Sequence, residues 1–226
     1  MKRNIQIPLS LIFWAVAAAD CIGIAANNAS LHYMAKPLLI PILLLLLAGT
    51  ATTLPRKNLL LAGLFFSWVG DMFLLFESRN NLFFIFGLVA FLITHIFYIT
   101  YFLKIRNAAD SLLKKQPALV ILVLGYGVTL VYILFPHLGG LKIPVMVYAA
   151  VICTMLLCSL HVFFKVNKPA ARLFVTGAFF FVLSDSSLAL NKFYQPFAYA
   201  GVLIMLTYCA AQYCIVNGFI KQLPHD

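Results

Sequence analysis

The sequence predicts an all-α membrane protein, a polytopic bundle of about eight transmembrane helices. Of its 226 residues, 64% are hydrophobic and only 10% are charged, and the mean hydropathy is +1.01. A soluble domain of this length cannot bury so much apolar surface. Apolar stretches of about twenty residues recur along the chain, and that is the length a helix needs to cross a bilayer. We expect residues 1–226 to form a single transmembrane domain.

The expected spans are separated by short polar breaks with turn chemistry. Asn27-Asn28, the segment 55–58, the segment 78–81, Pro136 to Gly140 and the segment 167–169 supply Asn, Pro, Gly and basic residues there. The eight predicted spans are residues 6–26, 34–54, 58–77, 81–104, 117–135, 142–165, 170–190 and 196–219.

The first span follows Lys2-Arg3 and contains Ala15-Val16-Ala17, a pattern that secretory signal peptides also show. We expect this helix to be retained. The five cysteines have no metal-ligand spacing, and we interpret them as small packing residues in apolar helices. The sequence therefore predicts neither a metal nor a cofactor.

The distribution of Lys and Arg predicts the topology. With the N-terminus in the cytoplasm, twelve basic residues fall on the cytoplasmic side and four on the opposite side. The four are Lys36, Arg79, Lys142 and Lys192. This positive-inside bias places both termini in the cytoplasm. The net charge of +10 then reflects topology and attraction to anionic membrane lipids rather than binding to nucleic acid.

Two aspartates lie inside apolar spans and share one local pattern. Residues 63–74 and 177–188 both read G-x-F-F-x-x-x-[GS]-D-x-x-L, which places Asp71 and Asp185 at equivalent positions, 114 residues apart. An acid at hydrocarbon depth costs about 2.5–3.5 kcal/mol on insertion scales, so it marks a functional site by default. The alternative is a buried acid held in a static network.

The match continues into the span that follows each aspartate. At the same offset, Phe83 pairs with Phe197 and Gly87 with Gly201. The hairpins 58–104 and 170–219 are therefore expected to be parallel internal repeats, related by an axis along the membrane normal. Such an axis turns both aspartates toward one central cavity.

Other polar residues are expected near the aspartates. Each also has a structural explanation, since intramembrane polar groups bond neighbouring helices and lysines near span ends extend to the interface. The candidate substrate-binding residues are Lys36, His95, Tyr98, Asn191, Lys192, Tyr208 and Gln212.

Two buried carboxyl groups suit acid–base chemistry. Burial raises the pKa of a carboxyl group, and where two face each other one serves as acid and the other as base. This division suits reactions through an oxocarbenium-like cation. These residues alone are compatible with acid–base catalysis on a lipid and with proton-coupled transport. They are also compatible with a lipid-binding or scaffolding role. No G-x-S-x-G or H-E-x-x-H motif is present.

The sequence resembles the YhhN family of membrane proteins over almost its whole length. Residues 65–74, 87–98 and 183–193 are similar to three family signatures, and Lys36-Pro37 and the segment 208–212 also fit. The family includes the lysoplasmalogenases. The resemblance implies hydrolysis of the vinyl ether bond of lysoplasmalogens to a fatty aldehyde and glycerophosphocholine or glycerophosphoethanolamine, with Asp71 and Asp185 as the catalytic pair.

The two carboxyl groups and the family resemblance together suggest a mechanism. A lysophospholipid enters from the outer leaflet, with its phosphate near Lys36 or Lys192. One aspartic acid protonates the vinyl ether, and the other stabilises the cation and activates water. His95 and Asn191 position the water or the glycerol oxygens. The expected partners are this substrate and membrane lipids, and the expected location is a bacterial inner membrane. A transporter would instead need two sealed compartments and show no activity in micelles.

Overall fold

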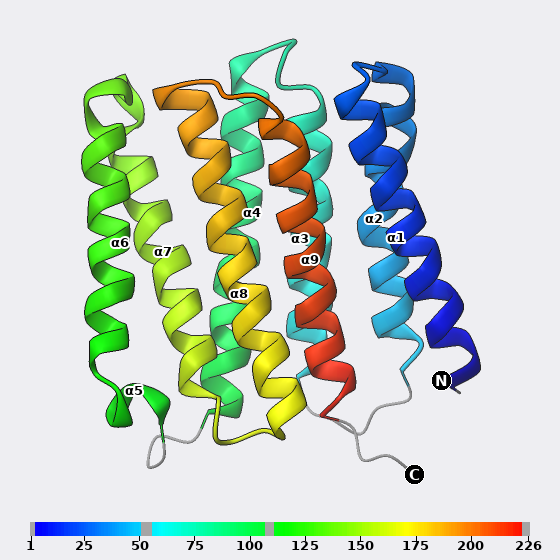
Figure 1. Cartoon of the computed structure of the whole chain (residues 1–226), viewed down its shortest axis with the longest axis vertical. Coiled ribbons are helices and arrows are strands. Elements are labelled where there is room, and N and C mark those ends of the chain that lie inside the picture. The colour runs from blue at the N-terminus through cyan, green and yellow to red at the C-terminus, as the bar shows by residue number, and fades with distance from the viewer. Residues whose placement is uncertain (1–2, 51–55, 107–110, 223–226) are drawn as a thin grey trace. The chain divides into compact units, whose positions relative to one another are not determined.

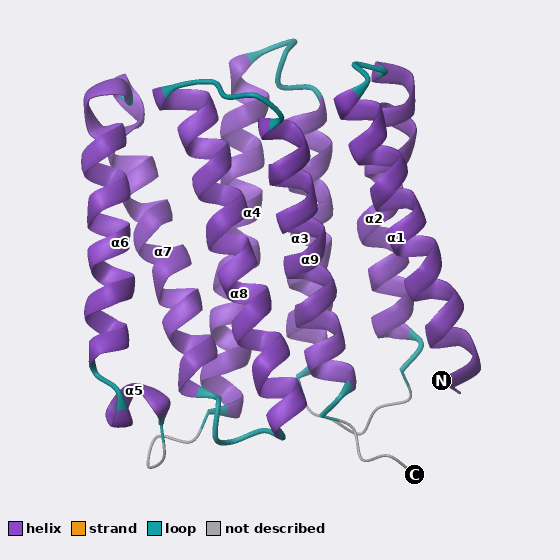
Figure 2. Cartoon of the chain, viewed as in Figure 1, coloured by secondary structure: helices purple, strands orange, loops and turns teal. Residues whose placement is uncertain are grey.

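The computed structural model describes residues 3–50, 56–106 and 111–222. These residues form helices joined by short loops and contain no strand, as Figure 2 shows. Eight of the helices are long and apolar enough to cross a membrane. The predicted all-α, multi-pass membrane fold is confirmed. The chain divides into two compact units, residues 1–98 and 99–224, with the boundary inside one helix, and the expectation of a single domain stays a prediction.

The first unit contains three complete helices and most of a fourth: α1 (Arg3–Ala25), α2 (Ala29–Ala48), α3 (Lys57–Leu75) and α4 (Asn81–Ile105). Helices α1 and α2 form a hairpin (Figure 1). Asn27 turns the chain with φ of 52°, and the Asn28 side chain accepts a hydrogen bond of 3.1 Å from the Leu31 amide. This cap starts α2 five residues before the predicted span 34–54, because Asn satisfies an amide that the helix leaves open.

Glycines let α3 and α4 pack closely. A Cβ on Gly63 would lie 2.4 Å from Cε1 of Tyr98, and one on Gly70 would lie 2.8 Å from the Phe91 ring. The Thr94 hydroxyl donates to the Gly63 carbonyl at 3.0 Å. Small residues with interhelical hydrogen bonds are typical of helix contacts in lipid, where apolar packing alone gives little preference.

The second unit contains the end of α4, the short α5 (Leu112–Lys115), α6 (Ala118–Leu134), two 3₁₀ turns (Phe135–His137 and Gly139–Leu141), α7 (Lys142–His161), α8 (Lys168–Ala189), a π-helical turn η3 (Leu190–Tyr194) and α9 (Ala200–Ile220). Helices α6, α7, α8 and α9 are neighbours in that order (Figure 1).

Several helix boundaries in this unit differ from the predicted ones. Helix α7 ends at His161 rather than at residue 165. Helix α8 begins two residues earlier than predicted, because the Asn167 side chain accepts from the Ala170 amide at 2.9 Å and Pro169 occupies its first turn. The short helix α5, which the Ser111 side chain caps, was not predicted from the sequence.

The α8–α9 hairpin is held by the same kind of contact as the α3–α4 hairpin. A Cβ on Gly177 would lie 2.9 Å from the Ala211 carbonyl oxygen and 2.8 Å from Ile215. The Ser184 hydroxyl donates to the Ile204 carbonyl at 3.0 Å. Gly63 and Gly177, at the predicted offset, each face the following helix. The parallel relation between the two hairpins stays a prediction.

Candidate active site

Asp71 lies inside the first unit, with only 2% of its surface exposed. Its Oδ1 is 3.9 Å from the Nζ of Lys36 on α2, which is itself 7% exposed. The lysine therefore does not extend to the membrane surface, as a residue near a span end often does. Removing one member of a buried ion pair leaves an uncompensated charge, so each of these two groups stabilises the other in its charged state.

His95 and Tyr98 lie on α4 in the same unit, and both are fully buried. The Nδ1 of His95 donates to the Phe91 carbonyl one turn earlier on its own helix. The Tyr98 ring packs against Gly63. Both residues therefore have structural contacts in addition to the substrate-binding role that the sequence analysis gave them.

Asp185 is half-buried on α8 and has a different neighbour. The phenol hydroxyl of Tyr148, on α7, donates to its Oδ2 at 2.6 Å. Tyr148 was not predicted from the sequence, because nothing in the local sequence of α7 marks it: its relation to Asp185 depends on the packing of α7 against α8. The two candidate catalytic carboxyl groups thus have different partners, an ammonium group for Asp71 and a phenol for Asp185.

The remaining predicted residues lie at the end of α8 and on α9. Asn191 is in the π-helical turn, where its Oδ1 accepts from the Phe197 amide at 3.3 Å. Lys192 in the same turn is exposed. Tyr208 and Gln212 are buried on α9, and the Tyr208 ring meets Phe181 of α8 edge-on at 5.7 Å between centroids. Asn191 therefore also orders the loop before α9.

A second polar pair, formed by an aspartate and a histidine, joins α1 to α2. It was not predicted from the sequence. Oδ1 of Asp20 is 2.7 Å from Nδ1 of His32, and Asp20 is fully buried. Among the described residues, the other oxygen, Oδ2, has no hydrogen-bond partner. An acid and a histidine on either side of the Asn27-Asn28 turn were a usable signal for this contact.

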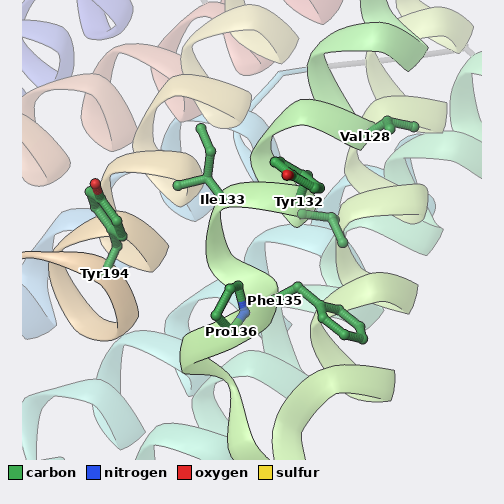
Figure 3. Close-up of a pocket in the computed structure, with 7 residues that line it drawn as sticks. Val128, Tyr132, Ile133, Phe135, Pro136 and Tyr194 are labelled. Atoms are coloured by element: carbon green, nitrogen blue, oxygen red, sulfur yellow. The ribbon is translucent and has the colours of Figure 1, made fainter.

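The second unit also has a pocket of about 550 Å³. Its walls come from the end of α6, the following 3₁₀ turn and Tyr194, which lies across from Ile133 and Pro136 in Figure 3. The lining is mostly apolar and includes none of the predicted site residues. In the part of the chain that the structure describes, no cluster of three or more His, Cys, Asp or Glu residues has the geometry of a metal site.

Two carboxyl groups with polar partners inside apolar helices provide the elements of general acid–base catalysis. A carboxyl group can give or take a proton where it is held close to the reacting atom. A buried ammonium group such as that of Lys36 can bind an anion as a point charge.

Apolar helices long enough to cross a membrane, with carboxyl groups inside them, define a class, the multi-pass membrane proteins with polar residues in their spans. The chain belongs to the YhhN family, whose family model matches residues 31–219. Both Asp71 and Asp185 lie within the matched region, whereas Asp20 lies before it.

Curated relatives are similar over most of the chain. The lysoplasmalogenase TMEM86A of Bos taurus is 32% identical over 178 residues, which are 77% of this chain and 70% of the relative. The lysoplasmalogenase of Mycobacterium tuberculosis (strain CDC 1551 / Oshkosh) is 31% identical over 206 residues, 86% of this chain and 75% of the relative. The lysoplasmalogenase TMEM86B of Mus musculus is 31% identical over 165 residues, 73% of this chain and 64% of the relative. No solved structure matches significantly.

Proposed function

We propose that this protein is a membrane-embedded hydrolase that cleaves the vinyl ether bond of lysoplasmalogens. The products are a fatty aldehyde and glycerophosphocholine or glycerophosphoethanolamine. Membership of the YhhN family and relatives named lysoplasmalogenase support the reaction. The structural observation that carries it is the buried contact between Lys36 and Asp71, which combines a group able to bind an anion with a carboxyl group inside an apolar helix.

Lys36 is proposed to bind the phosphate of the substrate. Its distance of 3.9 Å from Asp71 is longer than a charge-assisted hydrogen bond, which spans about 2.7–2.9 Å, so a phosphate oxygen can approach the ammonium group without breaking a tight contact. Only the glycerol backbone separates the phosphate from the vinyl ether oxygen. A phosphate at Lys36 therefore brings the vinyl ether toward Asp71, while the alkenyl chain extends between apolar helices.

The two aspartates are proposed to act as acid and base. One carboxylic acid gives its proton to the β-carbon of the vinyl ether, and an oxocarbenium ion forms at the α-carbon. The other carboxylate stabilises this cation and takes a proton from the water that attacks it. The hemiacetal then releases the glycerol oxygen as an alcohol and leaves the aldehyde, with one water consumed.

Supporting roles are proposed for the remaining predicted residues. His95 and Asn191 position water or the glycerol oxygens, and Tyr98, Tyr208 and Gln212 contact the substrate beside them. Lys192, in the exposed turn after α8, is the alternative phosphate ligand. Tyr148 is added to this set because its hydroxyl donates to Asp185. The protein is further proposed to lie in a bacterial inner membrane with both termini in the cytoplasm.

The test is aldehyde release by the protein purified in detergent. Lysoplasmenylethanolamine is the substrate, and Asp71→Asn and Asp185→Asn are compared with Glu77→Gln, which makes the same change from carboxyl to amide in the turn after α3. We expect aldehyde from the native protein and from Glu77→Gln, and none from the two aspartate variants at unchanged helix content. No aldehyde from folded native protein rejects this substrate and makes proton-coupled transport, measured in proteoliposomes, the next hypothesis.

A further inference from the structure

Helix α2 contains a carbonyl group that cannot be satisfied within the helix. Pro37 and Pro41 both lie inside it. In an α-helix the carbonyl of residue 37 accepts from the amide of residue 41, but proline has no N–H to donate. In a membrane no water reaches such a group, so a lipid-embedded helix needs another donor there.

The indole of Trp68 supplies that donor. Its Nε1 donates to the Pro37 carbonyl at 3.0 Å, in a partly buried setting. Tryptophan has a single polar hydrogen, so this bond uses the whole hydrogen-bonding capacity of the side chain. Because Trp68 is on α3, a carbonyl left open by a proline in α2 becomes a fixed link between the two helices.

This link lies next to the proposed catalytic pair. Pro37 follows Lys36 directly, and Trp68 is one helical turn before Asp71, on the same side of α3. At the cytoplasmic end of the predicted topology, the Nζ of Lys57 donates to the carbonyls of Ala48 and Thr50 at 2.7 and 2.8 Å. These contacts are all consistent with one antiparallel register of α2 and α3.

We infer that Trp68 is a positioning residue: its hydrogen bond to the Pro37 carbonyl holds α2 and α3 in the register that places Lys36 against Asp71. The assignment of a catalytic consequence rests on the proposed function. Trp68 acts through Lys36 and Asp71. The ion pair is long, at 3.9 Å, and its geometry therefore depends on the helices that carry it rather than on a tight bond of its own.

The first experiment measures aldehyde release by Trp68→Phe, which keeps an aromatic ring and removes the donor. Displacement of a catalytic group by about 1 Å can cost on the order of a hundredfold in rate, so we expect kcat to fall about ten- to a hundredfold. The matched control is Trp14→Phe, which changes the only other tryptophan, a partly exposed residue of α1, and should retain the native kcat. Native kcat in Trp68→Phe overturns the inference.

A second variant distinguishes two roles of Trp68: positioning α2 against α3, and only donating a hydrogen bond to the Pro37 carbonyl. In Trp68→Phe combined with Pro41→Ala, the new amide at position 41 can donate to the Pro37 carbonyl within α2, but it does not link α2 to α3. We expect the unfolding temperature to rise toward that of the native protein while kcat stays low. If kcat recovers together with the unfolding temperature, Trp68 only satisfies a carbonyl and the positioning role is rejected.

A third measurement does not need the enzymatic reaction. Unfolding temperatures in detergent are compared for Lys36→Met, Asp71→Asn and the double variant, first with Trp68 present and then in the Trp68→Phe background. Residues in contact give non-additive shifts, and independent residues give additive ones. We expect non-additive shifts with Trp68 and additive shifts without it. Equal non-additivity in both backgrounds overturns the inference, and this result stands even if the native protein releases no aldehyde, the outcome that rejects the proposed function instead.

Discussion

The hydroxyl of Tyr148 donates a hydrogen bond of 2.6 Å to the carboxylate of Asp185 and thereby joins α7 to α8 at the second aspartate of the repeated motif. Both residues lie within predicted membrane spans. Polar contacts in such surroundings are stronger than in water, and the same surroundings make an unpaired group costly. Tyr148 therefore fixes the direction in which the Asp185 carboxyl group points.

Replacing Tyr148 by Phe should slow the proposed reaction without abolishing it. The ring remains and the donor is lost, so Asp185 is less well oriented but still present. We expect kcat for aldehyde release to fall about tenfold, within the range of a misplaced catalytic group, whereas Asp185→Asn should remove activity. Tyr126→Phe, on an exposed tyrosine of α6, is the control and should leave the rate unchanged. A native rate in Tyr148→Phe would show that the hydrogen bond is not used.

Gly177→Ala should destabilise the α8–α9 hairpin. The added Cβ would lie 2.9 Å from the Ala211 carbonyl oxygen and 2.8 Å from Ile215, and the backbone oxygen cannot move aside as a side chain can. Overpacking of this kind costs about 1–3 kcal/mol. The control is Gly125→Ala on α6, where no atom outside the local helix lies within 4 Å. Unfolding in detergent, followed by circular dichroism, should show lower stability for Gly177→Ala alone, and equal stability of the two variants would contradict the close packing.

The local sequence was sufficient to predict the eight spans, since hydrophobic length alone decides whether a helix can cross a bilayer. It also singled out Asp71 and Asp185, because an acid in an apolar span is unusual in any context. Their partners depend on which helix faces which and in what register. Lys36 was expected as a substrate ligand near the outer surface, and the structure places it buried and against Asp71.

Tyr148 was missed because its role depends on such packing. Tyrosine is common in membrane helices and acquires its role here only through the packing of α7 on α8. The short α5 and the early start of α2 depend on single capping side chains, Ser111 and Asn28. Such caps shift helix ends by a few residues without changing the hydrophobic pattern.

The predicted topology can be tested by chemical labelling of single exposed positions. The charge bias places Arg79 outside and Lys114 in the cytoplasm, and both side chains are exposed. In intact cells, a membrane-impermeant thiol reagent should label Arg79→Cys and should reach Lys114→Cys only after the membrane is opened. Unmodified protein is the control, since its cysteines are buried or half-buried. Labelling of Lys114→Cys alone in intact cells would show that the orientation is the reverse of the predicted one.

His32→Phe should destabilise the α1–α2 hairpin more than removal of the whole polar pair. Asp20 is fully buried, and its Oδ1 has the His32 ring nitrogen at 2.7 Å. Losing the histidine leaves a buried carboxyl group without this partner, which costs about 3 kcal/mol, whereas replacing both members by apolar residues is often neutral. Unfolding in detergent should therefore show a large loss for His32→Phe and a recovery when Asp20→Leu is added. His137→Phe, on an exposed histidine, should change stability by less than about 0.5 kcal/mol. If the double variant is as unstable as His32→Phe alone, the His32 ring stabilises the hairpin by its packing and not by pairing with Asp20.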